Sequence, residues 1–361
     1  MSSKRRRRTG KGHAVTLVRS VLSLERKIRY LEKQKLALME RVAYLMRRES
    51  KVRTKQSKVN SRVRRIPICV EAGIGIITAL PEEFAAVKAS LLDCQYYCVA
   101  GKGAGRRYII GRIPSVHGGD HRIALAMCGM GNNVAAARAT LVLGHFSTID
   151  SVIMVGIAGG VPFPQKAEQH VRLGDIVVSD KKGVVQYDMI KLSEIRSCQV
   201  PTGAKWIESV ELLKVEEYCR KRPWDKHIKR LLSCFKQHRP DADTDVLYDS
   251  EDPSVRIDHP DDPARWIDAP RVFYGPIGSA NELLKDPKKR DRLRDAFGVK
   301  AIEMEGSGIA DATWYHEKSY IVVRGICDYC DSRKNDVWHK YAAIVAAGFA
   351  KALIESTTPE V

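Results

Sequence analysis

The feature that most constrains this chain is a regular alternation of short apolar stretches with helix-like stretches from residue 73 onward. IGIITA (Ile74–Ala79) and SVIMVGIAGG (Ser151–Gly160) have the length and composition of buried strands. LPEEFAAVKASL, which follows the first of them, has the pattern of a helix. Strands that alternate with helices predict an α/β fold with a mostly parallel sheet and helices on both faces. In such sheets, ligands bind at the carboxyl ends of the strands.

Glycines and acidic residues gather at the ends of these predicted strands. The strand ends contain Glu82 and Glu83, Gly129 and Gly131, Gly156 to Gly160, Glu303 and Glu305, and Asp328. Glycine turns let a flat ligand approach the backbone closely, and carboxylates can transfer protons in a reaction. The sequence therefore predicts a catalytic site at this edge of the sheet.

Two features of this edge suggest a cofactor or a metal, and we interpret neither in that way. Cys327 and Cys330 flank Asp328 with the C-x-x-C spacing of redox pairs and half-zinc sites, but no second pair follows at a matching spacing. Gly129 and Gly131 lack the third glycine of a dinucleotide-binding loop. We therefore predict a reaction that uses no metal or cofactor. Cys327 and Cys330 are then small apolar residues that flank the functional Asp328.

The motifs at the strand ends, taken in order, resemble the purine nucleoside phosphorylase and nucleosidase superfamily. They are IGIITALPEE, CGMGNNVAAARAT, VGIAGG, LGDIVVSD, AIEMEGSGIA and VVRGICDYCD. The resemblance covers residues 73–355 and is closest to the hydrolytic branch, the methylthioadenosine/S-adenosylhomocysteine nucleosidases. It implies a three-layer, nucleoside-phosphorylase-like α/β domain with a mostly parallel mixed sheet.

The resemblance implies catalytic roles for two acids. Asp328 occupies the position of the family's catalytic aspartate, which when protonated donates to N7 of a purine while the ribose becomes oxocarbenium-like. Glu83 falls where the hydrolytic branch carries its water-activating glutamate. Asp331 is interpreted as a residue that supports the site from behind or caps a helix, and Glu82 as a solvated residue of a first helical turn.

The same resemblance implies the residues that bind the substrate. Glu305 matches the glutamate that grips the ribose hydroxyls, and Met304 and Glu303 match its neighbours in the pocket. The remaining predicted contacts, around the base, are Ile157, Ala158, Gly159, Gly129, Cys327 and Asn281. Asn281 is the nearest match to the aromatic residue that stacks on the base in the simple nucleosidases.

The sequence favours water over phosphate as the nucleophile. Phosphorylases need cationic side chains near the glycine turns, and residues 78–83 and 127–133 contain no Arg or Lys. We therefore predict an N-glycosidase that releases a free purine, with a phosphate-dependent phosphorylase as the second interpretation. A third interpretation is a catalytically inert nucleotide-sensing module.

Residues 191–270 form an insert that is much longer than the matching segment of the simple nucleosidases. With this insert the chain is more similar to the phosphorylase-like domains of fungal NLR-type receptors and bacterial antiviral proteins, some of which cleave adenine nucleotides. The resemblance implies an adenine nucleoside or nucleotide as substrate, with an ATP-type substrate favoured and a methylthioadenosine/S-adenosylhomocysteine nucleosidase as the alternative. It also implies a defence or stress role. The phosphates would need cations, and the insert supplies the candidates Arg256, His259, Arg265 and Arg271.

The N-terminal part of the chain carries a different pattern. Leucines recur every seven residues, at positions 17, 24, 31, 38 and 45. Val21, Ile28 and Val42 alternate with them, and Lys35 is the one polar residue in that series. This pattern favours a parallel two-stranded coiled coil, and hence a homodimer or higher homo-oligomer. An amphipathic helix packed on the domain is the alternative.

The net charge of +18 belongs to this arm. Residues 1–65 hold 22 Lys and Arg against 4 Asp and Glu, whereas the rest of the chain holds 39 of each. The basic part is too short and too broken by glycine to be a groove-reading helix, so we predict at most weak contact with nucleic acid or an anionic surface. A basic zipper that binds nucleic acid belongs to the third interpretation.

These patterns divide the chain into a basic tail (1–13), a coiled coil (14–49), a basic linker (50–70) and the nucleosidase-like domain (71–358). No stretch has the length of a membrane span, and no secretory signal is visible. Nine cysteines without framework spacing suggest reduced thiols. We therefore expect a cytoplasmic protein, or a nuclear one in a eukaryote.

Overall fold

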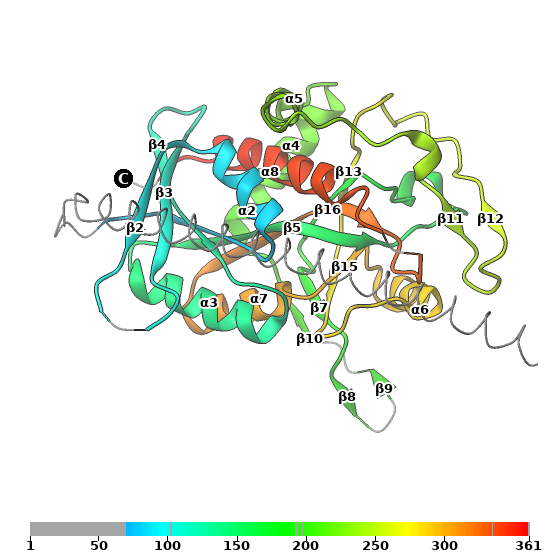
Figure 1. The fold of residues 1–361 in the computed structure, drawn as a ribbon, viewed down its shortest axis with the longest axis horizontal. Coiled ribbons are helices and arrows are strands. Elements are labelled where there is room, and N and C mark those ends of the chain that lie inside the picture. Colours follow the sequence, from blue (N-terminus) through cyan, green and yellow to red (C-terminus); the bar gives the residue numbers. More distant parts are fainter. Residues whose placement is uncertain (1–69, 102, 192–193, 196–197, 334, 360–361) are drawn as a thin grey trace, which may run out of the picture. The chain divides into compact units, whose positions relative to one another are not determined.

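The computed structural model describes residues 70–359 except 102, 192–193, 196–197 and 334 (Figure 1). The predicted tail, coiled coil and linker lie outside the described residues, apart from Val70, and remain predictions. From Val70 onward the chain forms a unit of its own. None of the helices described in this unit is both long and apolar enough to cross a membrane.

A twelve-stranded sheet forms the centre of this unit. Its strands are β1 (Ile74–Thr78), β2 (Leu92–Cys98), β3 (Arg107–Pro114), β4 (Asp120–Met127), β5 (Ser151–Gly160), β6 (Ile176–Val178), β7 (Val184–Gln186), β10 (Cys198–Val200), β13 (Val272–Tyr274), β14 (Ile277–Ser279), β15 (Ala301–Glu303) and β16 (Ser319–Asp328). Two small hairpins lie apart from it: β8 (Ile190–Lys191) with β9 (Glu194–Ile195), and β11 (Leu247–Tyr248) with β12 (Arg256–Ile257).

The sheet is mixed, as the sequence predicted. Its main path runs β10-β7-β14-β15-β5-β1-β4-β3-β2, and β16 pairs with β5 and β6. The central pairs β1–β4, β1–β5 and β5–β16 are parallel. The hairpin-connected strands β2, β3 and β4 pair antiparallel, as does β15 with β5. The parallel part therefore brings the carboxyl ends of β1, β5 and β16 to one edge.

Helices cover both faces of the sheet, which confirms the predicted α/β class (Figure 1). The helices α2 (Pro81–Ser90), α4 (Ala204–Tyr218), α5 (Pro223–Phe235) and α8 (His339–Glu355) lie on one face, and α3 (Asn132–His145) and α7 (Gly306–Tyr315) pack together on the other. The remaining helices are α6 (Pro287–Phe297) and two 3₁₀ turns, η1 (Ala167–Gln169) and η2 (Ala242–Thr244).

Local sequence explains where the helices near the sheet edge begin. Pro81 occupies the first turn of α2, where its missing N–H costs nothing, and the acids that follow it favour the positive end of the helix. Asp286 caps α6 by accepting from the backbone N–H groups of Lys288 and Lys289. Gly298, in the left-handed conformation, ends the same helix.

The centre of the fold is the pair β5–β16. All ten residues of β5 are buried, which explains its uninterrupted apolar and small-residue sequence. The pairing stays in register from Ser319 to Ile326 and then shifts, so that Asp328 lies opposite Gly159. A bulge of this kind re-aims a side chain at the end of a strand.

The predicted insert contains two helices, α4 and α5. The hairpin β11–β12 and a segment without regular structure up to Pro270 follow them. The helix α5 packs against α8, and β13 returns the chain to the sheet beside β6. The insert is therefore packed against the domain rather than appended to it.

Candidate active site

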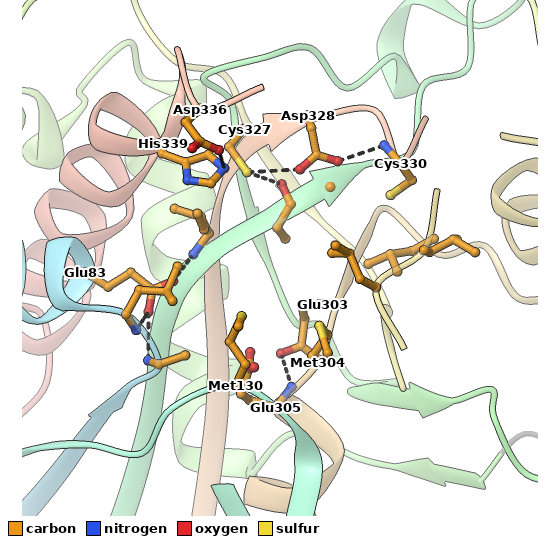
Figure 2. A pocket seen from close by; sticks show the side chains of 18 of the residues that line it. Glu83, Met130, Glu303, Met304, Glu305, Cys327, Asp328, Cys330, Asp336 and His339 are labelled. Atoms are coloured by element: carbon orange, nitrogen blue, oxygen red, sulfur yellow. Dashed lines mark hydrogen bonds and ion pairs between the residues drawn. The ribbon is translucent and has the colours of Figure 1, made fainter. Parts of the chain in front are cut away.

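A cavity of about 340 Å³ opens at the carboxyl ends of β1, β5, β15 and β16 (Figure 2). Its walls are formed by Ala79, Leu80, Glu82, Glu83, Met130, Ile157, Ala158, Gly159, Glu282, Leu283, Leu284, Ile302, Glu303, Met304, Glu305, Cys327, Asp328, Cys330, Asp336 and His339. The volume is in the range that small-molecule sites occupy. Seven of these side chains are carboxylic acids, and none is Lys or Arg.

Asp328 lies on one wall of the cavity, and the turn that follows it fixes its carboxyl group. The Oδ1 atom accepts from the backbone N–H of Cys330 at 2.8 Å, and Oδ2 accepts from the Cys327 thiol at 3.2 Å. Gly159 on β5 makes room for this turn. A Cβ at position 159 would lie 2.2 Å from the Cys330 sulfur and 2.8 Å from Asp328 Oδ1, so the position requires glycine.

Glu83 is almost completely buried at the start of α2. Its Oε2 accepts from the N–H groups of Ala79 and Leu80 at 2.7 and 2.8 Å, and its Oε1 accepts from Ile157 N–H at 2.8 Å. A carboxylate has about four acceptor positions, so one remains. Burial raises the pKa of Glu83, although Arg324 and the three N–H groups oppose the shift. A carboxylate with a raised pKa is suited to accept a proton.

Glu303 and Glu305 share the buried guanidinium of Arg324. Arg324 Nη2 contacts Glu303 Oε2 and lies 3.2 Å from Glu305 Oε2. Glu303 also accepts from the N–H groups of Glu305 and Gly306, so its carboxylate holds the turn between β15 and α7. Glu305 Oε1 accepts from Gly131 N–H at 2.9 Å, which joins the second glycine turn to the site. Burial raises the pKa of Glu305 to about 7, and Arg324 opposes the shift.

Arg324 is a buried residue behind the cavity that the sequence analysis did not name. It is fully buried on β16, and its Nη1 also donates to Ile157 O at 3.2 Å. The signal was present in SYIVVRGI, where one arginine interrupts an otherwise apolar strand. A charged residue in such a strand needs a buried partner, and the nearby acids are those partners.

Most of the predicted site residues line this one cavity. The predicted residues that line it are Glu83, Ile157, Ala158, Gly159, Glu303, Met304, Glu305, Cys327 and Asp328. Figure 2 shows Asp328 and the Glu303–Glu305 segment on different walls, with Glu83 on a third side. The cavity therefore presents one carboxyl group beside the β16 turn, two on the Glu303–Glu305 segment and the buried carboxyl group of Glu83.

Two predicted base contacts lie outside the cavity lining. Gly129 does not line the cavity, whereas its neighbour Met130 does. The Asn281 side chain bonds within the protein instead of lining the cavity. Its Oδ1 accepts from Asn132 N–H at 2.9 Å, at the start of α3. Leu283, which is half exposed, and Leu284 line the cavity instead. A contact between Asn281 and the base therefore stays a prediction.

The predicted phosphate contacts also lie outside the lining. Arg265 makes a two-bond ion pair with Asp175 at 2.7 and 2.8 Å, and Arg271 pairs with Asp262. His259 bonds His170 and Asp245, while Arg256 is exposed on β12. Three of the four are therefore engaged within the protein. Among the described residues, no group of three or more His, Cys, Asp or Glu is arranged to hold a metal ion.

Comparisons with known proteins agree with this geometry. Residues 73–356 match the family model described as the phosphorylase superfamily. An NLR-like protein of Hyaloscypha variabilis is 31% identical over 83% of this chain and 31% of its own length. The ATP nucleosidase Cap17 of Escherichia coli is 26% identical over 75% and 49%, respectively. A 5'-methylthioadenosine/S-adenosylhomocysteine nucleosidase of Mycobacterium bovis is 26% identical over 78% and 95%.

Two of these relatives are much longer than the aligned region, since the chain spans only about a third of one and about half of the other. Among solved structures, the S-adenosylhomocysteine nucleosidase of Streptococcus pyogenes has a TM-score of 0.54. It is 21% identical and covers 80% of this chain and 98% of its own. The fold, the family match and the sequence relatives agree, and the chain belongs to the phosphorylase superfamily.

Proposed function

We propose that this protein hydrolyses the N-glycosidic bond of an adenine nucleoside or nucleotide and releases free adenine. The observation that carries the proposal is the presence of Asp328, Glu83 and Glu305 around a single cavity of nucleoside size. The relatives named as purine nucleosidases support it.

In this mechanism one carboxyl group donates a proton, a second stabilises the sugar cation and a third acts as general base. Protonated Asp328 donates its proton to N7 of the base, and the electrons of the C1'–N9 bond leave with adenine. Ionised Glu305 accepts from the ribose hydroxyls and stabilises the positive charge that develops on the sugar. Glu83 takes a proton from a water molecule through its remaining acceptor position, and the hydroxide adds to C1'. The products are adenine and the ribose compound.

The cavity favours water over phosphate as the nucleophile. Phosphate would need cationic partners, and the lining formed by the described residues has no Lys or Arg. Arg324 lies behind Glu303 and Glu305, which already neutralise it. A phosphate-dependent phosphorylase remains the second enzymatic candidate.

The two candidate substrates differ at the 5' end, which carries phosphates in an ATP-type substrate and none in methylthioadenosine. Similarity to the ATP nucleosidase Cap17 supports the ATP-type substrate predicted from the sequence. The acidic lining instead supports a substrate without phosphates, such as methylthioadenosine, because Glu82, Glu282 and Asp336 would repel a polyphosphate. On geometry alone we favour the uncharged 5' end.

Chromatography of reactions with the full-length protein tests the proposal. ATP, AMP, adenosine, methylthioadenosine and S-adenosylhomocysteine would each be incubated with and without phosphate, with uridine as a control that lacks N7. We expect free adenine from at least one adenine compound, no uracil and no need for phosphate. Phosphate-dependent release would identify a phosphorylase, and no base from any compound would refute the enzyme.

We also propose that residues 14–49 join two copies of the chain as a coiled coil, with a cytoplasmic or nuclear location. The leucines that recur every seven residues support the coiled coil. Light scattering of the full chain and of a variant with Leu31→Asp and Leu38→Asp measures the mass of each. The same mass for both proteins would contradict the proposal.

A further inference from the structure

The side chain of Tyr329 joins the turn that carries Asp328 to the insert. Tyr329 follows Asp328 directly, and its ring is buried. The Tyr329 hydroxyl donates to Asp245 Oδ1 at 2.6 Å. Asp245 follows η2 within the insert, so the contact joins two segments that are 84 residues apart.

Asp245 is itself held firmly. Arg172 Nε donates to its Oδ2 at 2.9 Å, and His259 Nε2 bonds its backbone oxygen at 3.0 Å. Burial acts to raise the pKa of Asp245, but the bonds from His259 and Tyr329 and the charge of Arg172 outweigh it and keep the pKa below its usual range. Asp245 therefore stays an ionised acceptor for the Tyr329 hydroxyl.

The orientation of the Asp328 carboxyl depends on where Tyr329 lies. Cys330, the next residue, has a φ of +55° and donates its N–H to Asp328 Oδ1. That conformation is uncommon for a residue with a side chain and must be held by its surroundings. Arg290 Nη1 on α6 donates to Tyr329 O at 2.8 Å, and Asp245 holds the other end of Tyr329. If the ring moves, the N–H that orients the carboxyl moves with it.

We propose that Asp245 and Tyr329 are positioning residues, through which the insert sets the direction in which Asp328 presents its proton to the substrate. The inference rests on the proposed function, because it assigns a role in that reaction. Small errors in the placement of a proton donor lower the rate of the chemical step more than they weaken binding of the ground state. The insert thus becomes part of the catalytic apparatus.

Tyr329→Phe tests the inference, since it removes the hydroxyl and keeps the ring. Tyr320→Phe is the matched control. Tyr320 is a buried tyrosine at the other end of β16, and its hydroxyl bonds Val200 O and Val184 N. Each change removes one buried tyrosine hydroxyl from the same segment, so both should lower Tm. Only Tyr329→Phe should lower kcat, by about tenfold, with KM changed by less than about twofold.

The outcomes separate the two proposals. If the wild-type protein releases no base from any adenine compound, the proposed function fails and this inference fails with it. If the wild type is active and folded Tyr329→Phe has the wild-type kcat, only the inference is overturned. An equal loss of kcat in Tyr320→Phe would also overturn it. If Tyr329→Phe does not fold, Asp245→Asn replaces it, and a wild-type kcat in that variant counts against the inference.

Discussion

Arg324 Nη2 lies 3.2 Å from Glu305 Oε2, and neither side chain is accessible to more than a trace of solvent. Arg324 also contacts Glu303, so one guanidinium serves two buried carboxylates. Because burial disfavours every charge in this group, the protonation of Glu305 depends on the presence of Arg324.

Replacing Arg324 with Met should destabilise the protein strongly and abolish activity. The change leaves Glu303 and Glu305 buried without their cation, and breaking a buried pair in this way costs about 3–5 kcal/mol. Urea unfolding measures the loss. Arg112→Met is the control, because Arg112 forms ion pairs with Asp93 and Asp120 at the surface and should change little. Equal effects of the two changes would contradict the prediction.

The pH dependence of kcat/KM should show the ionisation of Glu305. Only the carboxylate form accepts from the ribose hydroxyls and stabilises a cationic sugar, so activity needs the group above its pKa. With that pKa at about 7, kcat/KM should rise with pH up to about 7 and level off above it. Initial rates across the neutral range measure this limb. A profile that is flat through neutral pH would show that Glu305 is not the titrating group.

Asp328→Asn should reduce kcat by at least about 100-fold, because an amide can accept from Cys330 N–H but cannot transfer a proton to N7. Asp331→Asn is the matched control. It makes the same chemical change three residues away, where the side chain accepts from Arg333 N–H outside the cavity lining. Adenine release by the two variants, measured side by side, gives the comparison. Similar activity in both would remove Asp328 from the mechanism.

Gly159→Ala should lower both stability and activity. The new methyl group would overlap the Cys330 sulfur and crowd Asp328 Oδ1, and overpacking of this kind costs about 1–3 kcal/mol. Gly144→Ala, in α3, has open space around it and should be neutral or stabilising by about 0.5–1 kcal/mol. Thermal unfolding of both variants checks the sign, and a destabilised Gly144→Ala with a normal Gly159→Ala would refute the packing argument.

The sequence predicted the α/β class and the edge of the sheet at which the cavity lies, because buried strands and the residues that follow them are local patterns. Asp328, Glu83 and Glu305 could be named because they follow such strands and match the motifs of the family that the sequence resembles. Arg324 was missed because its role depends on two acids that only folding brings to it. Leu283, which lines the cavity, was not named because a segment without regular structure leaves no periodic signal in the sequence.

The insert was the part least open to prediction. Of the four cations proposed for phosphates, Arg265, Arg271 and His259 bond to other protein groups, and Arg256 is exposed. Arg265 pairs with Asp175, which precedes β6, and no spacing in the sequence indicates that contact. Long-range ion pairs of this kind follow from the fold and not from the local sequence.

The Arg265–Asp175 ion pair and the Tyr329–Asp245 hydrogen bond limit how far this protein can be shortened. Trimming residues 204–271 to the length of the simpler enzymes would remove Arg265 and Asp245 together. Asp175 would then remain buried without its guanidinium and Tyr329 would lose the acceptor for its hydroxyl, each at a cost of about 1–3 kcal/mol or more. A minimal version of the domain therefore needs compensating apolar replacements in the core, and deletion alone would not produce one.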